Sequence, residues 1–237
     1  LDTAVHALVD MPEGMAPALV VERFDIPQIS DPQAKRILIQ DFCAISRLDP
    51  EEHKYDSPLE NCADVLMKVS SCPVDDAKNF LRRVTLSVVM GDGDMHMKNL
   101  SVLHTMDTET GDITTRLSPT YDVLSTRVFP SREKQRDEVG QFALSINGSQ
   151  RFWPSKSDLI DLAEHMGISA DEAEEIVTET ASKIAGHALK LGEAPPEIIS
   201  KKPDCLFGFK CAVTEILANA EDLGAEVPIH QMYFWPQ

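Results

Sequence analysis

Apolar residues recur at helical spacing along most of the chain, and strand-like patterns occur only in short stretches. One helix is predicted from Pro32 to Ile45, with Ser30 or Asp31 as its cap. Further helices are predicted over residues 61–71, 75–90, 157–166, 170–191 and 204–220. Strands are predicted at 18–21 and 142–146, and as a hairpin at 100–104 and 113–117. The pattern as a whole predicts an α+β fold that is mostly helical.

Composition narrows the class of protein and its partners. The chain has 237 residues, of which 43% are hydrophobic, enough for one sizeable core or for a small lobe joined to a large one. Its net charge of −17 excludes the general Lys/Arg excess that binds nucleic-acid backbones, so we expect no direct nucleic-acid contact. No apolar run is long enough to cross a bilayer, and no membrane partner is expected. The five cysteines contain no C-x-x-C pair, which favours a reduced, cytoplasmic protein.

The segment Met90–Asn99 concentrates polar groups at the end of an apolar helix. Phosphoryl transfer requires a carboxylate beside the attacking hydroxyl, a group that holds metal, and cations near the transferred phosphoryl group. Asp94 and Asn99 stand five positions apart in a tight loop, so they can face one site from its two ends. We therefore predict that Asp94 faces the hydroxyl and that Asn99 faces the metal. Asp92 is expected to end the helix rather than to bind a ligand.

A second acid for the metal is predicted directly after the hairpin. Magnesium is usually held by carboxylate, water and phosphate oxygens. Asp122 follows the second predicted strand and can supply such a carboxylate. Because a hairpin brings its two ends together, Asn99 and Asp122 are expected to lie close in space. Tyr121 beside it is expected to pack rather than to react.

Four segments carry a resemblance to a known family. Gly93–Asn99 resembles the catalytic loop of the HipA family of serine/threonine kinase toxins, and Ser118–Ser125 resembles the metal-binding segment of that family. Val21–Asp25 resembles its hinge, and Arg47–Tyr55 is similar to the polar segment after its first C-lobe helix. Both catalytic motifs in the right order make this signal specific. The hinge motif alone would be weak.

The resemblance implies roles for the residues of the catalytic segments. Asp94 would be the catalytic base. Asn99 and Asp122 would be magnesium ligands. His96 and Lys98 would lie near the phosphates of ATP, with catalytic and nucleotide-binding roles.

The resemblance also implies a fold and a nucleotide-binding hinge. The expected fold is a protein-kinase-like C-lobe with a small active-site hairpin and only a remnant of the N-lobe. Residues 1–30 would hold that remnant and the hinge, and residues 31–237 would form the catalytic lobe. Glu22 and Phe24 would contact adenine through main-chain atoms, and Asp25 would lie near the ribose.

The implied activity is that of an ATP- and Mg²⁺-dependent serine/threonine protein kinase of a toxin–antitoxin system. Its protein substrate would be an aminoacyl-tRNA synthetase or another translation protein, and its partner a HipB-like antitoxin. The residues before Glu22 contain no lysine and no glycine-rich loop. We therefore expect a fragment, or a lobe that needs a separate small-lobe chain. Two alternatives stay open: a small-molecule phosphotransferase of the aminoglycoside or choline type, and a non-catalytic lobe that only binds an antitoxin or partner chain.

Overall fold

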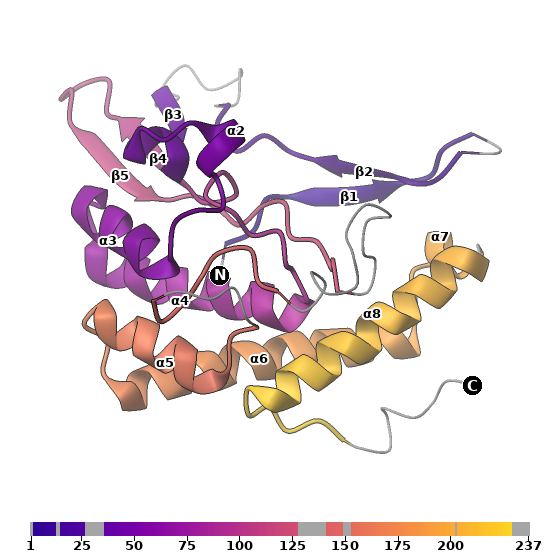
Figure 1. Cartoon of the computed structure of the whole chain (residues 1–237). Coiled ribbons are helices and arrows are strands. Elements are labelled where there is room, and N and C mark those ends of the chain that lie inside the picture. The colour runs from indigo at the N-terminus through magenta and orange to yellow at the C-terminus, as the bar shows by residue number, and fades with distance from the viewer. Residues whose placement is uncertain are drawn as a thin grey trace.

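The computed structural model of the chain describes residues 2–12, 15–26, 36–127, 141–148, 153–201 and 203–228. The long helices lie together in the lower half of Figure 1, and the strands lie above them. The predicted helix start at Pro32, its cap at Ser30 or Asp31, and the predicted boundary between residues 30 and 31 lie outside the described residues.

The strands of the described residues form two antiparallel sheets. In the first, β1 (His6–Val9) pairs with β2 (Ala18–Val21). In the second, the order is β3 (Arg36–Asp41), β4 (Ser101–Met106) and β5 (Ile113–Leu117). The predicted hairpin is thus confirmed as β4 and β5, which pair antiparallel.

The predicted helix over 32–45 is wrong for most of its described part. Residues 36–41 form β3, which pairs with the whole of β4, and the helix α1 covers only Phe42–Ser46. Ile37 and Ile39 are β-branched and suit a strand, and the ladder to β4 overrides the helical spacing of the apolar residues. Asp41 then begins the helix, since its side chain accepts a hydrogen bond from the amide of Ala44 at 2.8 Å.

The other predicted helices are confirmed with small differences at their ends. They share apolar faces that pack on one another, which is why their periodicity was visible. The remaining helices are α2 (Pro50–His53), α3 (Leu59–Val69), α4 (Pro73–Met90), α5 (Lys156–His165), α6 (Ala170–Glu193), α7 (Glu197–Ser200) and α8 (Pro203–Asp222).

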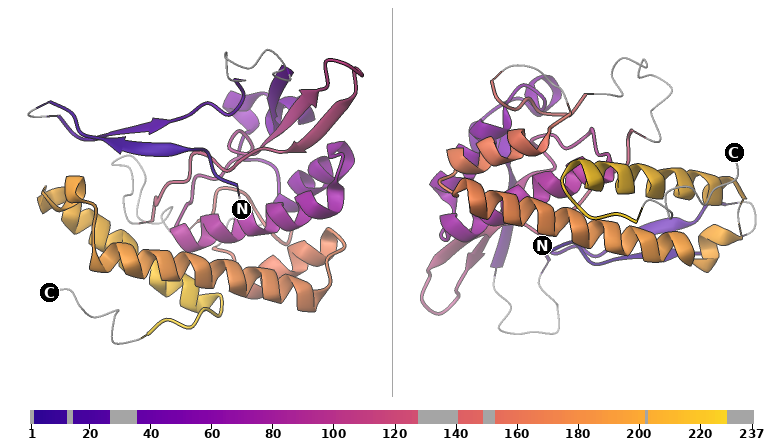
Figure 2. Two further views of the ribbon diagram at one scale, coloured as in Figure 1. Left: turned by 180° about the vertical axis from the view of Figure 1, so that it is seen from behind. Right: turned by 90° about the horizontal axis from the view of Figure 1, so that it is seen from below.

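Helix α4 is the central helix of the fold. It contacts α3, α5, α6 and α8, and Figure 2 shows α6 and α8 running beneath it. Phe80, Leu81 and Val84 are fully buried in this core. Gly91 ends the helix with φ +71°, a left-handed conformation that glycine adopts without a side-chain clash. The polar loop therefore leaves the helix from a buried and well-fixed point.

The prediction of a strand at 142–146 is wrong. This segment packs Phe142, Leu144 and Ile146 into the core without forming a strand. The carbonyl of Ser145 accepts a hydrogen bond from the amide of Leu59 at the start of α3, at 2.9 Å. Phe142, Ala143 and Leu144 are buried in succession, so the segment lacks the alternation of a strand and its burial reflects packing in the core.

The β1–β2 hairpin extends away from the three-stranded sheet and runs above the level of α6 and α8 in Figure 1. Its apolar side chains are largely uncovered: Leu19 is 64% exposed and Val20 is 51% exposed. A strand pair with apolar side chains on both faces usually has them covered, so this exposed apolar surface is unusual. None of the helices in the described part of the chain combines the length and apolar character needed to cross a bilayer.

Candidate functional site

The loop after α4 folds back on itself and brings Asp94 next to Asn99. The carbonyl of Asp94 accepts hydrogen bonds from the amide of His96 at 2.8 Å and from Nδ2 of Asn99 at 3.3 Å. The Asp94 carboxylate is half-buried, and its Oδ1 accepts a hydrogen bond from the hydroxyl of Tyr55 at 2.7 Å. Two of the predicted site residues therefore share one compact turn.

Asp122 lies beside the same turn. Nδ2 of Asn99 is 3.5 Å from both the carbonyl and Oδ2 of Asp122, so the hairpin does bring these two residues together. The Asp122 side chain is exposed, while Asn99 is buried. Asp122 has φ +57°, a conformation that few residues other than glycine, asparagine and aspartate adopt. Asp94, Asn99 and Asp122 thus converge on one place.

His96 and Lys98 lie on the same loop in different environments. His96 is 8% exposed, and its ring meets the ring of Tyr55 edge-on at 5.1 Å between centroids. Burial lowers the pKa of His96, while the nearby charge of Asp94 opposes this shift. Its Nδ1 is buried and makes no hydrogen bond within the described residues. The Lys98 side chain is exposed, and its carbonyl accepts a hydrogen bond from the Tyr121 hydroxyl at 2.7 Å.

The residues predicted to form the hinge contact the site through an aromatic pair. The ring of Phe24 lies 5.7 Å from that of Tyr121, the neighbour of Asp122. The amide of Glu22 donates to the carbonyl of Val5 at 2.8 Å, so that donor is already engaged. Asp25 is held instead by Arg23, with 2.5 Å between Nη2 and Oδ2, and this hydrogen bond lowers the pKa of Asp25.

The donor chemistry at the site fits a magnesium ion that is only partly held by protein. Asn99 and Asp122 offer amide and carboxylate oxygens, the ligand types that magnesium prefers. Among the described residues, no group of three or more His, Cys, Asp or Glu side chains could hold a metal ion by itself. An ion at Asn99 and Asp122 would therefore need water and phosphate oxygens to complete its ligand shell.

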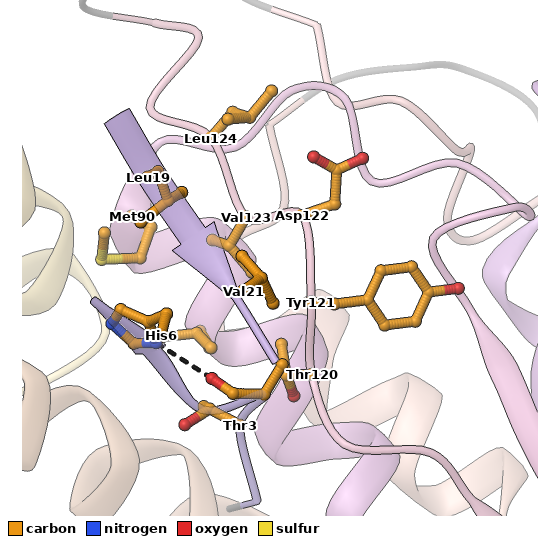
Figure 3. A pocket seen from close by; sticks show the side chains of 12 residues that line it. Thr3, His6, Leu19, Val21, Met90, Thr120, Tyr121, Asp122, Val123 and Leu124 are labelled. Atoms are coloured by element: carbon orange, nitrogen blue, oxygen red, sulfur yellow. Dashed lines mark hydrogen bonds between the residues drawn. The ribbon is translucent and has the colours of Figure 1, made fainter. Parts of the chain in front are cut away.

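An apolar cavity of about 600 Å³ lies next to the site, between the β1–β2 hairpin, the end of α4 and the loop after β5. Figure 3 shows β2 passing over this loop, with Tyr121 turned away from the strand. The cavity reaches Asp122, and its apolar lining includes Leu19, Val21, Leu86, Met90, Val123 and Leu124.

Two residues near the loop were not assigned to the site from the sequence. Tyr55 contacts Asp94 from the polar segment that resembles the family, but nothing in its own neighbourhood marks it. Asp92 was expected to end the helix, yet it is 1% exposed and its Oδ1 accepts a hydrogen bond from the amide of Asp94 at 3.0 Å. Asp92 therefore also supports the loop that carries Asp94.

Burial raises the pKa of Asp92 from 3.8 to about 7. The folded state then holds a proton that the unfolded state has lost, so stability falls as the pH rises from about 4 to about 7. We expect this group to lower the free energy of unfolding at pH 8, relative to pH 5, by on the order of 2 kcal/mol. Less urea should therefore unfold the protein at pH 8. The Asp92→Asn variant should lose most of this dependence in urea unfolding followed by circular dichroism. A midpoint that changes with pH in the variant as it does in the wild type would contradict this.

Comparisons with known proteins show the family and the fold of this chain. The family model of the HipA-like C-terminal domain matches residues 1–188. The chain belongs to this family. Two Sinorhizobium fredii proteins whose names mark them as candidate kinases are similar to this HipA-like domain. Y4dM is 30% identical over 181 residues, covering 75% of this chain and 39% of Y4dM, and Y4mE is 35% identical over 118 residues, covering 48% and 26%.

The HipA-like domain also resembles a solved structure of HipA from Shewanella oneidensis MR-1, in a complex with HipB and operator DNA. The TM-score is 0.71 at 19% identity, over 93% of this chain and 51% of that one, which shows the fold. The family resemblance and the mostly helical α+β fold predicted from the sequence are thereby confirmed. The HipA-like domain spans less than half the length of the two curated relatives.

Proposed function

We propose that this chain is the catalytic lobe of an ATP- and Mg²⁺-dependent serine/threonine protein kinase of the HipA toxin type. The observation that carries the proposal is the position of Asn99, whose Nδ2 contacts the carbonyl of Asp94 and lies 3.5 Å from the carboxylate of Asp122. A base and a metal-binding pair are thus joined through one side chain. Phosphoryl transfer uses this combination.

Each residue of the site has a role in this proposal. Asp94 accepts the proton of the serine or threonine hydroxyl, and the hydrogen bond from Tyr55 holds its carboxylate in place. Asn99 and Asp122 would hold the magnesium ion, which when bound neutralises charge on the phosphate oxygens. His96 and Lys98 lie beside the phosphates. The unpaired Nδ1 of His96 supports a polar ligand near it, because buried polar atoms are usually hydrogen-bonded.

The hinge binds the base of ATP in this proposal. Glu22 and Phe24 contact adenine through main-chain atoms, and the contact of Phe24 with Tyr121 supports a position close to Asp122. Since the Glu22 amide donates its hydrogen bond to the carbonyl of Val5, the carbonyl of Glu22 is the group left to contact adenine. The ribose role of Asp25 requires that its pairing with Arg23 open or adapt.

A small lobe completes the kinase in this proposal, either within a longer protein of which this chain is a fragment or as a separate chain. Residues 1–30 would be the remnant of that lobe with the hinge, and residues 31–237 the catalytic lobe. The uncovered apolar β1–β2 hairpin and the cavity beside Asp122 support the proposal that the small lobe packs on them, since large exposed apolar surfaces usually mark contact sites. The small lobe would also supply the phosphate-binding lysine that is lacking before Glu22.

The proposed partners follow from the family. The substrate is a protein, such as an aminoacyl-tRNA synthetase or another translation protein, in the cytoplasm. A HipB-like antitoxin would bind the kinase, and the solved HipA in complex with HipB supports this partner. Direct contact with DNA is not proposed, because the net charge of −17 opposes it.

Calorimetric titration of the full chain with ATP, with and without magnesium, tests the proposal. Magnesium-dependent binding is expected, either for the chain alone or after a small-lobe polypeptide is added. A radiolabelled transfer assay then compares a serine- and threonine-containing protein with kanamycin and choline as acceptors. Transfer to the small molecules alone would replace the protein-kinase proposal. Absence of binding at millimolar ATP in both preparations would leave a lobe that only binds partners.

A further inference from the structure

Arg83 is a charged residue inside the core of the domain, halfway along α4. It is 2% exposed, and burial lowers its pKa to about 10. Its hydrogen-bond partners are the carbonyl of Ser118 and the hydroxyl of Thr120, the latter at 3.2 Å from Nε, rather than a carboxylate. Burying a cation without a carboxylate partner costs free energy, and an apolar side chain would fill the same space at lower cost. The guanidinium therefore requires an explanation other than packing.

The groups that Arg83 holds belong to the segment leading to Asp122. On its other side, Thr120 pairs with the start of the chain, through its amide to the carbonyl of Asp2 and its carbonyl to the amide of Ala4, both at 2.8 Å. The segment is thus fixed from two directions, by a side chain of α4 and by the backbone before β1. Figure 3 shows Thr120, Tyr121 and Asp122 in succession along this loop.

The segment needs such support because of the conformation of Asp122. Aspartate adopts a left-handed φ of +57° more readily than most residues, but an extended or right-handed backbone is still more favourable for it, so contacts of the segment help to keep this conformation. Tyr121 contributes through its hydroxyl bonds to Lys98 and Ser101. Arg83 acts one step earlier, where the chain turns away from β5.

A second buried charge on α4 holds the end of β5 in a similar way. Asp76 lies seven positions before Arg83, two helical turns away on the same face. Its carboxylate accepts the amide of Leu117 at 3.0 Å and pairs with Arg116 at 3.0 Å. One face of α4 thus contacts backbone groups of Leu117 and Ser118 and the side-chain hydroxyl of Thr120. These contacts link the central helix to the loop of the site.

We propose that Arg83 is the positioning residue of the metal-binding segment, whose buried guanidinium fixes residues 118–120 so that Asp122 stays left-handed beside Asn99. The role toward magnesium rests on the proposed function. The role in ordering the segment does not.

Hydrogen–deuterium exchange of the full chain without ligand tests the ordering role. In Arg83→Met, the amides of residues 120–125 are expected to exchange at least about tenfold faster than in the wild type. The amides of α4 and α6 should keep their rates. The matched control is Arg82→Met, since the neighbouring arginine is only half-buried and bonds to Asn79 of its own helix. Equal exchange of the amides of residues 120–125 in the wild type and both variants would overturn the proposal.

Magnesium-dependent nucleotide binding tests the second role. Arg83→Met should weaken ATP binding with magnesium by about tenfold or more and leave binding without magnesium unchanged. An equal loss with and without magnesium would show a general structural role and overturn the proposal. If Arg83→Met does not fold, Thr120→Val removes one acceptor only and should accelerate exchange in the same segment. A wild-type chain that binds no nucleotide would defeat the proposed function, while the exchange experiment would still decide the ordering role.

Discussion

Replacing Asp122 with asparagine is expected to abolish the magnesium dependence of ATP binding. The carboxylate is the charged oxygen ligand of the proposed metal pair, and an amide binds magnesium far less well. The loss should exceed the roughly 10–100-fold that removal of an outer-shell partner costs at metal sites. Calorimetric titration with ATP at fixed free magnesium measures it. Asparagine tolerates the left-handed φ of +57°, so the fold should be kept.

The control for this experiment is Asp92→Asn, which makes the same chemical change at a buried aspartate on the neighbouring loop. Asp92 accepts the amide of Asp94, and an asparagine oxygen can do the same. We therefore expect almost unchanged magnesium-dependent binding in this variant. Equal losses in both variants would contradict the assignment of the metal to Asp122 and Asn99.

The second large effect is expected for Asp94→Asn, on the rate of phosphoryl transfer by a preparation of the protein that is active as a kinase. The variant cannot accept the hydroxyl proton, so the rate of transfer should fall by about 10²–10⁴-fold. Nucleotide affinity should be unchanged, because the amide oxygen can still accept the hydrogen bond from Tyr55. Single-turnover transfer to a protein substrate, measured beside ATP binding, separates the two quantities.

Two results would contradict the role of Asp94 as a base. One is transfer at the wild-type rate, and the other is a loss of ATP affinity as large as the loss of rate. Tyr55→Phe serves as the comparison, since it keeps the carboxylate and removes only the group that holds it. We expect a smaller fall in rate for this variant than for Asp94→Asn.

Local patterns explain why much of this fold and site could be predicted from the sequence. The apolar periodicity of α4 lies within the helix itself, so its extent was predicted closely. The segment from Gly93 to Asn99 concentrates polar side chains that a helix end does not need, at Asp94, His96, Lys98 and Asn99, and this concentration pointed to chemistry. The proximity of Asn99 and Asp122 followed from the hairpin between them.

The errors and omissions depend on contacts between distant parts of the chain. β3 is a strand because β4 lies beside it, and that neighbour is about sixty residues away in the sequence. Tyr55 and Arg83 have ordinary neighbours in the sequence, and they matter because the fold brings Asp94 and Thr120 to them. Residue type alone could not show this.

The uncovered β1–β2 hairpin has a consequence for the behaviour of the chain in solution. Each of its strands has one edge without a paired strand among the described residues, and Leu19 and Val20 are uncovered beside it. Such edges favour association between copies. The net charge of −17 opposes that association through repulsion, which salt weakens. Dilute, low-salt buffers therefore favour separate molecules, and concentrated salt favours their clustering through the hairpin.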